Sequence, residues 1–386
     1  MTKKIISILT ILLVATCVFC NLNEKIGYAD ELSDSIEEQM GNIDLSEIEN
    51  FFDENGGFDN KTFLEYVKEM LNGKYQAEYD NVGKRITSIL FSEVNKLLPS
   101  LVSITLIAIF CGIFQGMRSS FASDGVANLI SFVGLLAVIL IISLEISSLW
   151  KDCENIIKNI ANLSTIMSPI ITTLMVAGGA KVSASLYSPT VTVLSNLIIN
   201  VLLGIALPLI AIMIIFSIIS NFSSSVKLSK FTDLASSIIK WTLGITATVF
   251  TVFLSVQGIT SATYDGISVK AAKYAISNSI PLVGGFLRDG FDLVLAGSVL
   301  IKNSVGLACI FGVINLILSP VIKMTIFSLI LKTCSAVTEP ISDGRISNFC
   351  TSIAKCVNYL LAVTLVVGLM FFITILLMIF SASVFI

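Results

Sequence analysis

The chain has 386 residues, of which 55% are hydrophobic and only 13% are charged, and its formal net charge is −3. Soluble domains carry about 25% charged residues, so this composition fits a protein that is solvated mostly by lipid. The sequence contains no histidine, which excludes histidine-ligated metals, imidazole bases and Ser-His-Asp triads. Lys and Arg form no cluster that suits nucleic acid. We therefore predict an integral membrane protein that is not an enzyme, needs no cofactor and binds no nucleic acid.

The eight cysteines show no pattern of a metal or disulfide site. The one CxxC spacing, Cys17 to Cys20, lies inside the apolar N-terminal segment, and the other six are scattered in or beside apolar runs. We interpret them as small apolar residues that suit a membrane interior.

The N-terminus has the pattern of a secretory signal. Two lysines precede an apolar run, Ile5–Cys20, that is short for a membrane span. Small residues at Gly27 and Ala29 favour cleavage after Ala29, which predicts that residues 1–29 are a cleaved signal peptide. An uncleaved membrane anchor is the alternative.

Residues 30–97 form the water-soluble part of the sequence. Sixteen of the 27 acidic residues lie between Glu24 and Asp80. So short a region with sparse apolar content cannot bury a large core, and we expect a small helical domain outside the cytoplasm that packs on itself and on a partner. Three amphipathic patterns predict its helices, at residues 32–43, 61–71 and 79–98.

From residue 98 to 386 the sequence predicts an all-α, polytopic transmembrane bundle. Two short apolar pieces, 169–179 and 281–295, each begin with proline and contain a Gly-Gly pair. We expect these two to be re-entrant or interfacial, since broken helices at membrane depth occur only where protein covers the backbone. Six longer runs reach or approach the roughly 20 residues that a span needs: 101–117, 126–149, 191–219, 241–259, 305–331 and 357–380.

A weak internal repeat runs through these spans. Pro99, Pro208 and Pro320 are 109 and 112 residues apart, and each opens an apolar run that contains Ile-Phe and is followed by a polar stretch and a second apolar run. The later two copies agree best, since IFSIIS from Ile215 matches IFSLIL from Ile326. The pattern predicts about three repeated helical hairpins, with chance similarity among apolar residues as the alternative.

Lys and Arg at the hairpin tips predict the orientation of the chain. Cytoplasmic loops are enriched in these residues, so we place the tips in the cytoplasm and both ends of the mature chain outside. Lys151, Lys158 and Lys181, and later Lys270 and Lys273, fall on the opposite side and weaken the pattern. The tip residues are Arg118, Lys227, Lys230, Lys240, Lys332, Arg345 and Lys355.

The most polar stretch beside an apolar run is 279–306, SIPLVGGFLRDGFDLVLAGSVLIKNSVG. Ionisable groups at membrane depth are costly, so they indicate function by default. We predict a segment for assembly or conduction, and the alternative is an interfacial segment whose charges pair with each other or with lipid headgroups. Its candidate residues are Pro281, Gly284, Gly285, Arg288, Asp289, Asp292, Lys302 and Asn303.

Four further polar residues lie within apolar runs. Glu145 and Lys323 would lower each other's desolvation cost if they paired, although Lys323 could equally extend to the membrane surface. Asn196 and Asn200 share one helix face and could hydrogen-bond across a helix interface.

The N-terminal signal pattern, the short acidic region and the apolar hairpins, with the motif at 279–306, resemble the stage III sporulation protein AE family of endospore-forming Firmicutes. The resemblance covers essentially the whole mature chain. It implies a multi-protein complex that spans the two membranes around the engulfed forespore. In that complex the protein would lie in the mother-cell membrane beside a secretion-type ATPase and ring-forming subunits. The resemblance implies no catalytic residues.

Two classes of function stay open. The first is a non-enzymatic subunit of a transenvelope channel or secretion complex that links mother cell and forespore. The alternative is a stand-alone secondary transporter or permease with a site at the repeat interface. The acidic region favours the first class, because an assembly subunit can dock through such a domain.

Overall fold

Every element in the part of the chain that the computed structural model describes is a helix, which confirms the all-α prediction. The predicted signal peptide, Pro281 and the tip residues Arg118 and Lys227 lie outside that part. The described residues are 36, 38–41, 43–58, 61–72, 79–116, 124–222, 228–279, 284–340 and 344–383.

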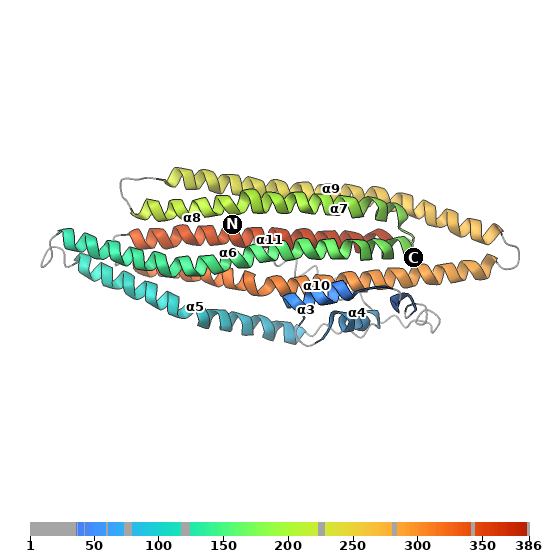
Figure 1. The fold of residues 1–386 in the computed structure, drawn as a ribbon, viewed down its shortest axis with the longest axis horizontal. Helices are drawn as coiled ribbons and strands as arrows, with labels where there is room; N and C mark the ends of the chain where they lie inside the picture. Colours follow the sequence, from blue (N-terminus) through green and yellow to red (C-terminus); the bar gives the residue numbers. More distant parts are fainter. Residues whose placement is uncertain are drawn as a thin grey trace.

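The helices form one elongated bundle in which successive long segments alternate in direction, with residues 181–222 running as one segment (Figure 1). Two short helices lie along one side of it. In chain order the elements are α3 (Ser46–Asn55), α4 (Phe63–Leu71), α5 (Tyr79–Gly116), α6 (Asp124–Ala177), α7 (Lys181–Val201), the π-helical turn η2 (Leu202–Ala206), α8 (Leu207–Phe222), α9 (Ser229–Ser279), α10 (Gly284–Thr338) and α11 (Arg345–Ser383).

The long helices exceed the thickness of a bilayer. Among the described residues, six helical stretches are long and apolar enough to cross a membrane, as expected for a multi-pass membrane protein. However, α6 has 54 residues and α10 has 55, which gives each a length of about 80 Å at 1.5 Å per residue, against about 30 Å of hydrocarbon. Much of the bundle therefore lies outside the hydrocarbon layer.

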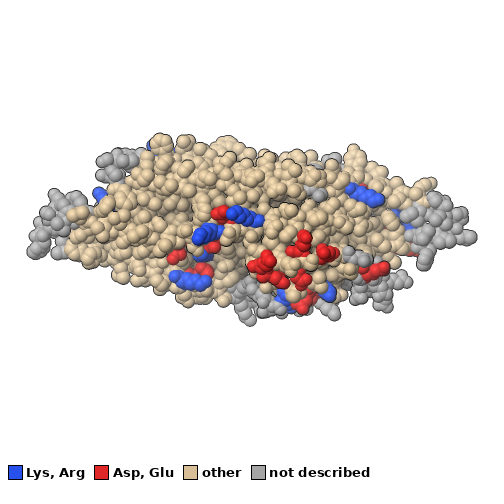
Figure 2. Space-filling model, in the orientation of Figure 1, with Lys and Arg blue, Asp and Glu red and all other residues tan. Residues whose placement is uncertain are grey.

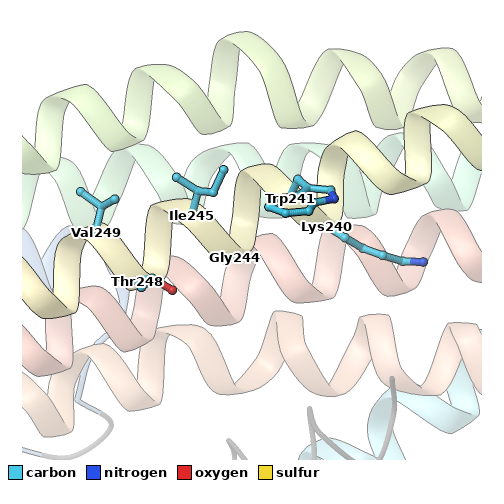
Figure 3. Close-up of a pocket in the computed structure, with 6 residues that line it drawn as sticks. All are labelled: Lys240, Trp241, Gly244, Ile245, Thr248 and Val249. Atoms are coloured by element: carbon cyan, nitrogen blue, oxygen red, sulfur yellow. The ribbon is translucent and has the colours of Figure 1, made fainter.

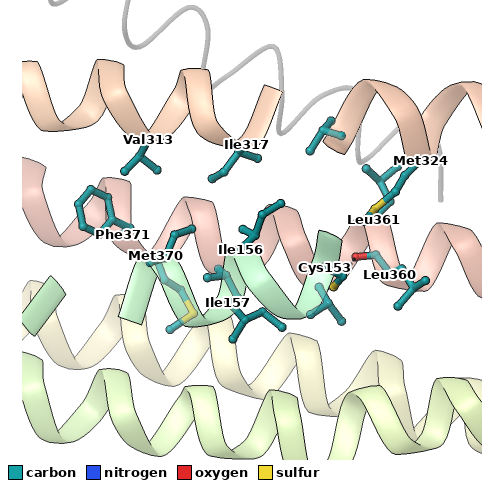
Figure 4. Close-up of a cluster of buried hydrophobic side chains, with 14 of the residues drawn as sticks. Cys153, Ile156, Ile157, Val313, Ile317, Met324, Leu360, Leu361, Met370 and Phe371 are labelled. Carbon is teal, nitrogen blue, oxygen red and sulfur yellow. Dashed lines mark hydrogen bonds between the residues drawn. The ribbon is translucent and has the colours of Figure 1, made fainter. Parts of the chain in front are cut away.

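The core lies where α6, α10 and α11 pack together (Figure 4). Apolar side chains from all three helices interlock there, among them Ile156, Ile317 and Phe371. The Thr364 hydroxyl donates to the backbone carbonyl of Leu360 at 3.1 Å, so this buried polar group is satisfied within its own helix.

The two Pro/Gly-Gly segments are not confirmed as re-entrant. Pro169 lies inside α6, which continues to Ala177, and a tight turn then leads into α7. Gly179 in that turn has a φ of +85°, a left-handed conformation that favours glycine. Residues 284–295 are the first turns of α10, so the described parts of both segments belong to the ends of long helices.

The acidic region folds against the bundle of its own chain. The Phe52 ring of α3 is buried beside α10, at a point where a side chain on Gly312 would collide with it. Asn315 of α10 donates to the Gly57 carbonyl at 3.2 Å. These two contacts join the acidic region to the face of α10 around Gly312 and Asn315. The predicted boundary at residue 97 falls inside α5, which continues unbroken through Pro99.

Local signals in the acidic region account for its helix starts. Thr62 and Glu65 form a capping box at the start of α4, which satisfies two backbone donors of the first turn. Before α3, hydrogen bonds from the Ser46 side chain and backbone lower the pKa of Asp44, so this exposed carboxylate is held in its charged form.

Candidate functional site: two apolar belts and the charges between them

The described part of the predicted segment 279–306 carries a charge cluster in the first turns of α10. Lys273 of α9 contacts the Asp292 carboxylate at 2.8 Å, and Nε of Arg288 lies 4.0 Å from the same carboxylate. Arg288 and Asp289 are exposed. Farther along α10, the Ser298 hydroxyl donates to Oε1 of Gln39 at 2.7 Å, so the acidic region of the same chain reaches this segment.

Lys302 and Asn303 are not part of that cluster. Lys302 is fully buried, and its Nζ donates to the backbone carbonyls of Met378 and Ile379 at 2.9 and 2.8 Å. These carbonyls belong to the C-terminal end of α11, the negative end of its dipole, and their hydrogen bonds offset part of the cost of burying the Lys302 amine. Lys302 therefore fixes the end of α11 to α10. Asn303 is half-buried, and its Oδ1 has no hydrogen-bond partner among the described residues.

Glu145 and Lys323 do not pair with each other. Ser100 of α5 donates to Glu145 at 3.2 Å, whereas Nζ of Lys323 contacts Ser148 and Asp152, each at 2.8 Å. Sequence reasoning missed Asp152 as the partner of Lys323. The signal was present, because residues 145, 148 and 152 share one face of a helix.

Asp265 is a further residue that the sequence pattern does not single out, although it is fully buried. Its carboxylate accepts backbone hydrogen bonds from Val182 and Ser183, at 2.7 and 3.0 Å, at the N-terminus of α7. Asp265 therefore caps α7 from a neighbouring helix and fixes its position against α9.

Asn196 and Asn200 lie on the outward face of α7. Neither amide hydrogen-bonds to another described residue, so they do not join two helices of this chain. The exposed neighbours Val193 and Leu197 are apolar, and no charged residue occurs between Lys181 and Lys227.

Exposed lysines occur at both ends of the bundle. Lys230 and Lys332 are exposed near the α8–α9 and α10–α11 turns, as the predicted tips require. Lys181 and Lys270 are exposed at the opposite end. The cytoplasmic placement of the tips therefore stays a prediction.

The hairpin of α5 and α6 carries an outward apolar surface that we call the hairpin belt. Its two helices are free of charge over residues 97–116 and 125–144, 20 residues each, or about 30 Å, which matches one bilayer. The exposed apolar residues of the hairpin belt are Leu98, Val102, Leu106, Phe110, Ile113, Leu129, Phe132, Val133, Leu140 and Leu144.

A second apolar surface follows Lys240 of α9 along a shallow groove (Figure 3), and we call this part the α9 belt. Three exposed apolar residues of α9, Phe231, Leu234 and Ile238, precede Lys240 and are not counted in it. Lys240 and Trp241 stand at its start, and no charge follows until Asp265. Trp241 is 72% exposed, a rare state for tryptophan in water. The exposed apolar residues of the α9 belt are Trp241, Ile245, Val249, Val252, Phe253 and Val256.

The two belts lie at different levels, that is, at different positions along the long axis of the bundle. One small cavity is lined by Ile160 of α6, Ser195 of α7 and Phe250 of α9, which places these residues side by side. Helices α6 and α9 run in the same direction (Figure 1). Asp152 lies eight residues before Ile160, and Trp241 lies nine before Phe250. The α9 belt therefore begins near the level of Asp152 and extends away from the hairpin belt.

The acidic helices share the level of the α9 belt. Nδ2 of Asn159 donates to Oδ1 of Asn55 in α3 at 2.8 Å, one residue from the cavity-lining Ile160. Asp53 and Glu54 beside this contact are exposed. Figure 2 shows acidic side chains gathered over α3 and α4. At one level, the bundle therefore presents carboxylates near α3 and bare apolar side chains along α9.

Comparisons with known proteins agree with the resemblance. A family model described as stage III sporulation protein AE matches residues 61–382. The stage III sporulation protein AE of Bacillus subtilis (strain 168) is 27% identical over 383 residues, which cover 94% of this chain and 95% of that protein. No solved structure matches the chain. The chain therefore belongs to the stage III sporulation protein AE family and is a sporulation-associated protein with the helices of a multi-pass membrane protein.

Proposed function

We propose that this protein is a non-enzymatic membrane subunit of a multi-protein sporulation complex, a channel or secretion assembly between mother cell and forespore. The observation that carries the proposal is the α9 belt. Large bare apolar patches on a soluble surface mark sites that other proteins cover.

The level of the α9 belt argues that protein, and not lipid, covers it. Asp53 and Glu54 are exposed at that level, and ionised carboxylates avoid the hydrocarbon layer. Lipid would then cover the hairpin belt, whose charge-free runs fit one bilayer. Val249 is 50% exposed, and such a surface in water favours association through the hydrophobic effect.

The place of the complex comes from the resemblance. We place the protein in the mother-cell membrane around the forespore, beside a secretion-type ATPase and ring-forming subunits. The charged start of α10, with Arg288 and Asp292, offers a second, polar contact for such partners.

The three hairpins are proposed to be copies of one unit. Pro99, Pro208 and Pro320 lie 17, 14 and 18 residues before the last residue of α5, α8 and α10. Each proline thus stands at a similar height above the turn of its hairpin, which supports a duplication.

The stand-alone transporter is less well supported. A transporter site near the centre of a bundle needs room for its substrate. Among the described residues, one cavity lies at the centre of the bundle between α6, α7, α9 and α11, lined by Ser164, Ser195 and Thr374, and it has room for about one water molecule.

Photo-crosslinking in sporulating cells tests the proposal. A photoreactive residue at Val249, in the α9 belt, should yield adducts with other protein chains. The matched control is Leu140 in the hairpin belt, which is 67% exposed and should react mainly with lipid. Absence of any protein adduct at Val249, while the protein accumulates normally, would overturn the proposal.

A further inference from the structure

We propose that a second copy of this chain packs on the outward face of α7, with the two copies related by a two-fold axis along the bundle. This inference rests on the proposed function, since it names which protein covers part of the exposed apolar surface. The face lies beside the α9 belt, because α7 packs against α9. Its exposed apolar residues are Leu186, Val193, Leu197 and, just beyond α7, Ile205.

The chemistry of α7 suits a two-fold axis. Copies of one membrane protein share an orientation, so residues near the axis meet their own counterparts. A charged residue would meet a like charge there. The outward face of α7 has none, since no charge occurs at residues 182–226. The α9 belt is less suited to the axis because Lys240 stands at its start.

The side-chain amides of Asn196 and Asn200 also suit contact with a second copy. An asparagine side chain both donates and accepts, so Asn196 can pair with Asn196 of a second copy, and Asn200 with Asn200. Neither has a hydrogen-bond partner among the described residues, and both are exposed. One turn farther, Gly204 has open space where a side chain would stand, so a second helix can approach closely.

The available area is sufficient for a dimer. The outward face runs about 28 Å along Leu186–Ile205, and the α9 belt adds about 22 Å along Trp241–Val256, at 1.5 Å per residue. With a helix width of about 10 Å, this is about 500 Å² per copy and about 1,000 Å² in all, the size at which specific interfaces begin. The absence of charge on α7 means that two such faces meet without burying an unpaired ion.

Disulfide cross-linking of the full chain tests the inference, in membranes that contain no other sporulation protein. Leu197→Cys should give a covalent dimer after mild oxidation, since a disulfide needs the two Cα atoms within about 7 Å. Leu140→Cys, on the hairpin belt, is the matched control and should stay monomeric. The parent chain controls for native thiols, of which the six described ones are buried.

A second substitution tests the axis itself. Asn200→Asp keeps the shape of the side chain but sets two like charges against each other, so it should lower the Leu197→Cys dimer roughly tenfold or more. Asn200→Gln keeps the amide and should retain most of the dimer. An unchanged dimer yield with Asn200→Asp, or an equal yield from Leu140→Cys, would overturn the inference.

The result in sporulating cells separates this inference from the proposed function. If Leu197→Cys forms no dimer, but a photoreactive residue at Val249 still captures other proteins, then the second copy is wrong and the assembly role stands. If neither position yields a protein adduct, both fail.

Discussion

The hairpin belt and the α9 belt have similar compositions but different surroundings. Each is a charge-free helical surface, about 30 Å long in the hairpin belt and about 22 Å long in the α9 belt. The hairpin belt lies on one side of the Lys323–Asp152 pair, whereas the α9 belt lies on the other side, level with the acidic helices. The comparison teaches that the length of an apolar run does not reveal whether lipid or protein covers it. The level of the nearest exposed charge does.

The largest expected loss of stability concerns the packing of Phe52 against α10, the contact that holds the acidic helices at their position along the bundle. Phe52→Ala removes a buried ring from between α3 and α10, and a loss of this kind costs about 3–5 kcal/mol. We expect α3 and α4 to detach from the bundle, with faster hydrogen exchange in residues 43–72. Gly312→Leu should have the same effect from the other side of the contact. Unchanged exchange in both variants would show that the acidic helices do not dock there.

A lysine placed in each belt should have different consequences in the two belts, and we expect an effect slightly smaller than that of Phe52→Ala. Leu140→Lys in the hairpin belt puts a cation into lipid, at about 2.5–3.5 kcal/mol for the centre of a span, and should lower the amount of protein in the membrane. Val249→Lys in the α9 belt should leave that amount unchanged but reduce assembly and spore counts. Immunoblots and spore counts of both variants check this. Equal loss of protein in both would place the two belts in the same environment.

Loss of the Lys323–Asp152 ion pair, which lies between the two belts, should lower the stability of the fold by an intermediate amount. Asp152→Asn leaves Lys323 without its counter-charge at a site that is 21–30% exposed, so we expect a loss of roughly 1–3 kcal/mol, between the values for surface and buried pairs. Thermal unfolding in detergent measures it. The double variant Asp152→Leu with Lys323→Met should recover part of the loss. No recovery would mean that the pair has a role beyond neutralising charge.

The smallest effect on stability is expected at the start of α10. The Arg288–Asp292 contact is 4.0 Å long and substantially exposed, and exposed pairs contribute about 0–1 kcal/mol. Asp292 also contacts Lys273 at 2.8 Å, so the loss of Asp292 should cost slightly more than the loss of Arg288. Arg288→Ala and Asp292→Ala should therefore leave protein levels intact while they lower spore counts through a lost partner contact. Normal sporulation in both variants would remove the functional claim for this segment, and loss of the protein itself would make it a folding element.

The sequence alone predicts the helices well and their environments poorly. The all-α fold and the acidic region follow from composition and 3.6-residue periodicity. The level of each helix depends on side chains that meet across the bundle, such as Asn159 with Asn55 or Asp265 with the start of α7. Such contacts join residues about 80 to 100 positions apart, and no local pattern encodes them.

The candidate sites show the same contrast between what the local sequence predicts and what contacts across the bundle decide. The periodicity correctly puts Asn196 and Asn200 on one face, but only the structure shows that this face points away from the bundle. The prediction that 169–179 forms a separate segment assumes that Pro169 ends a helix. A proline inside a long packed helix need not end it, and α6 continues past Pro169 to Ala177. The sequence groups Lys302 with the charges before it, whereas its hydrogen bonds in the structure join it to the end of α11.

The most direct test of the central claim is the lipid contact of each belt in the protein reconstituted in a bilayer. A fluorophore attached at Leu140→Cys and, separately, at Val249→Cys would be exposed to lipids with brominated chains, which quench only on contact with the hydrocarbon. We expect strong quenching at Leu140 and little at Val249, because only the hairpin belt should lie in the hydrocarbon layer. Equal quenching at both positions, or stronger quenching at Val249, would contradict it.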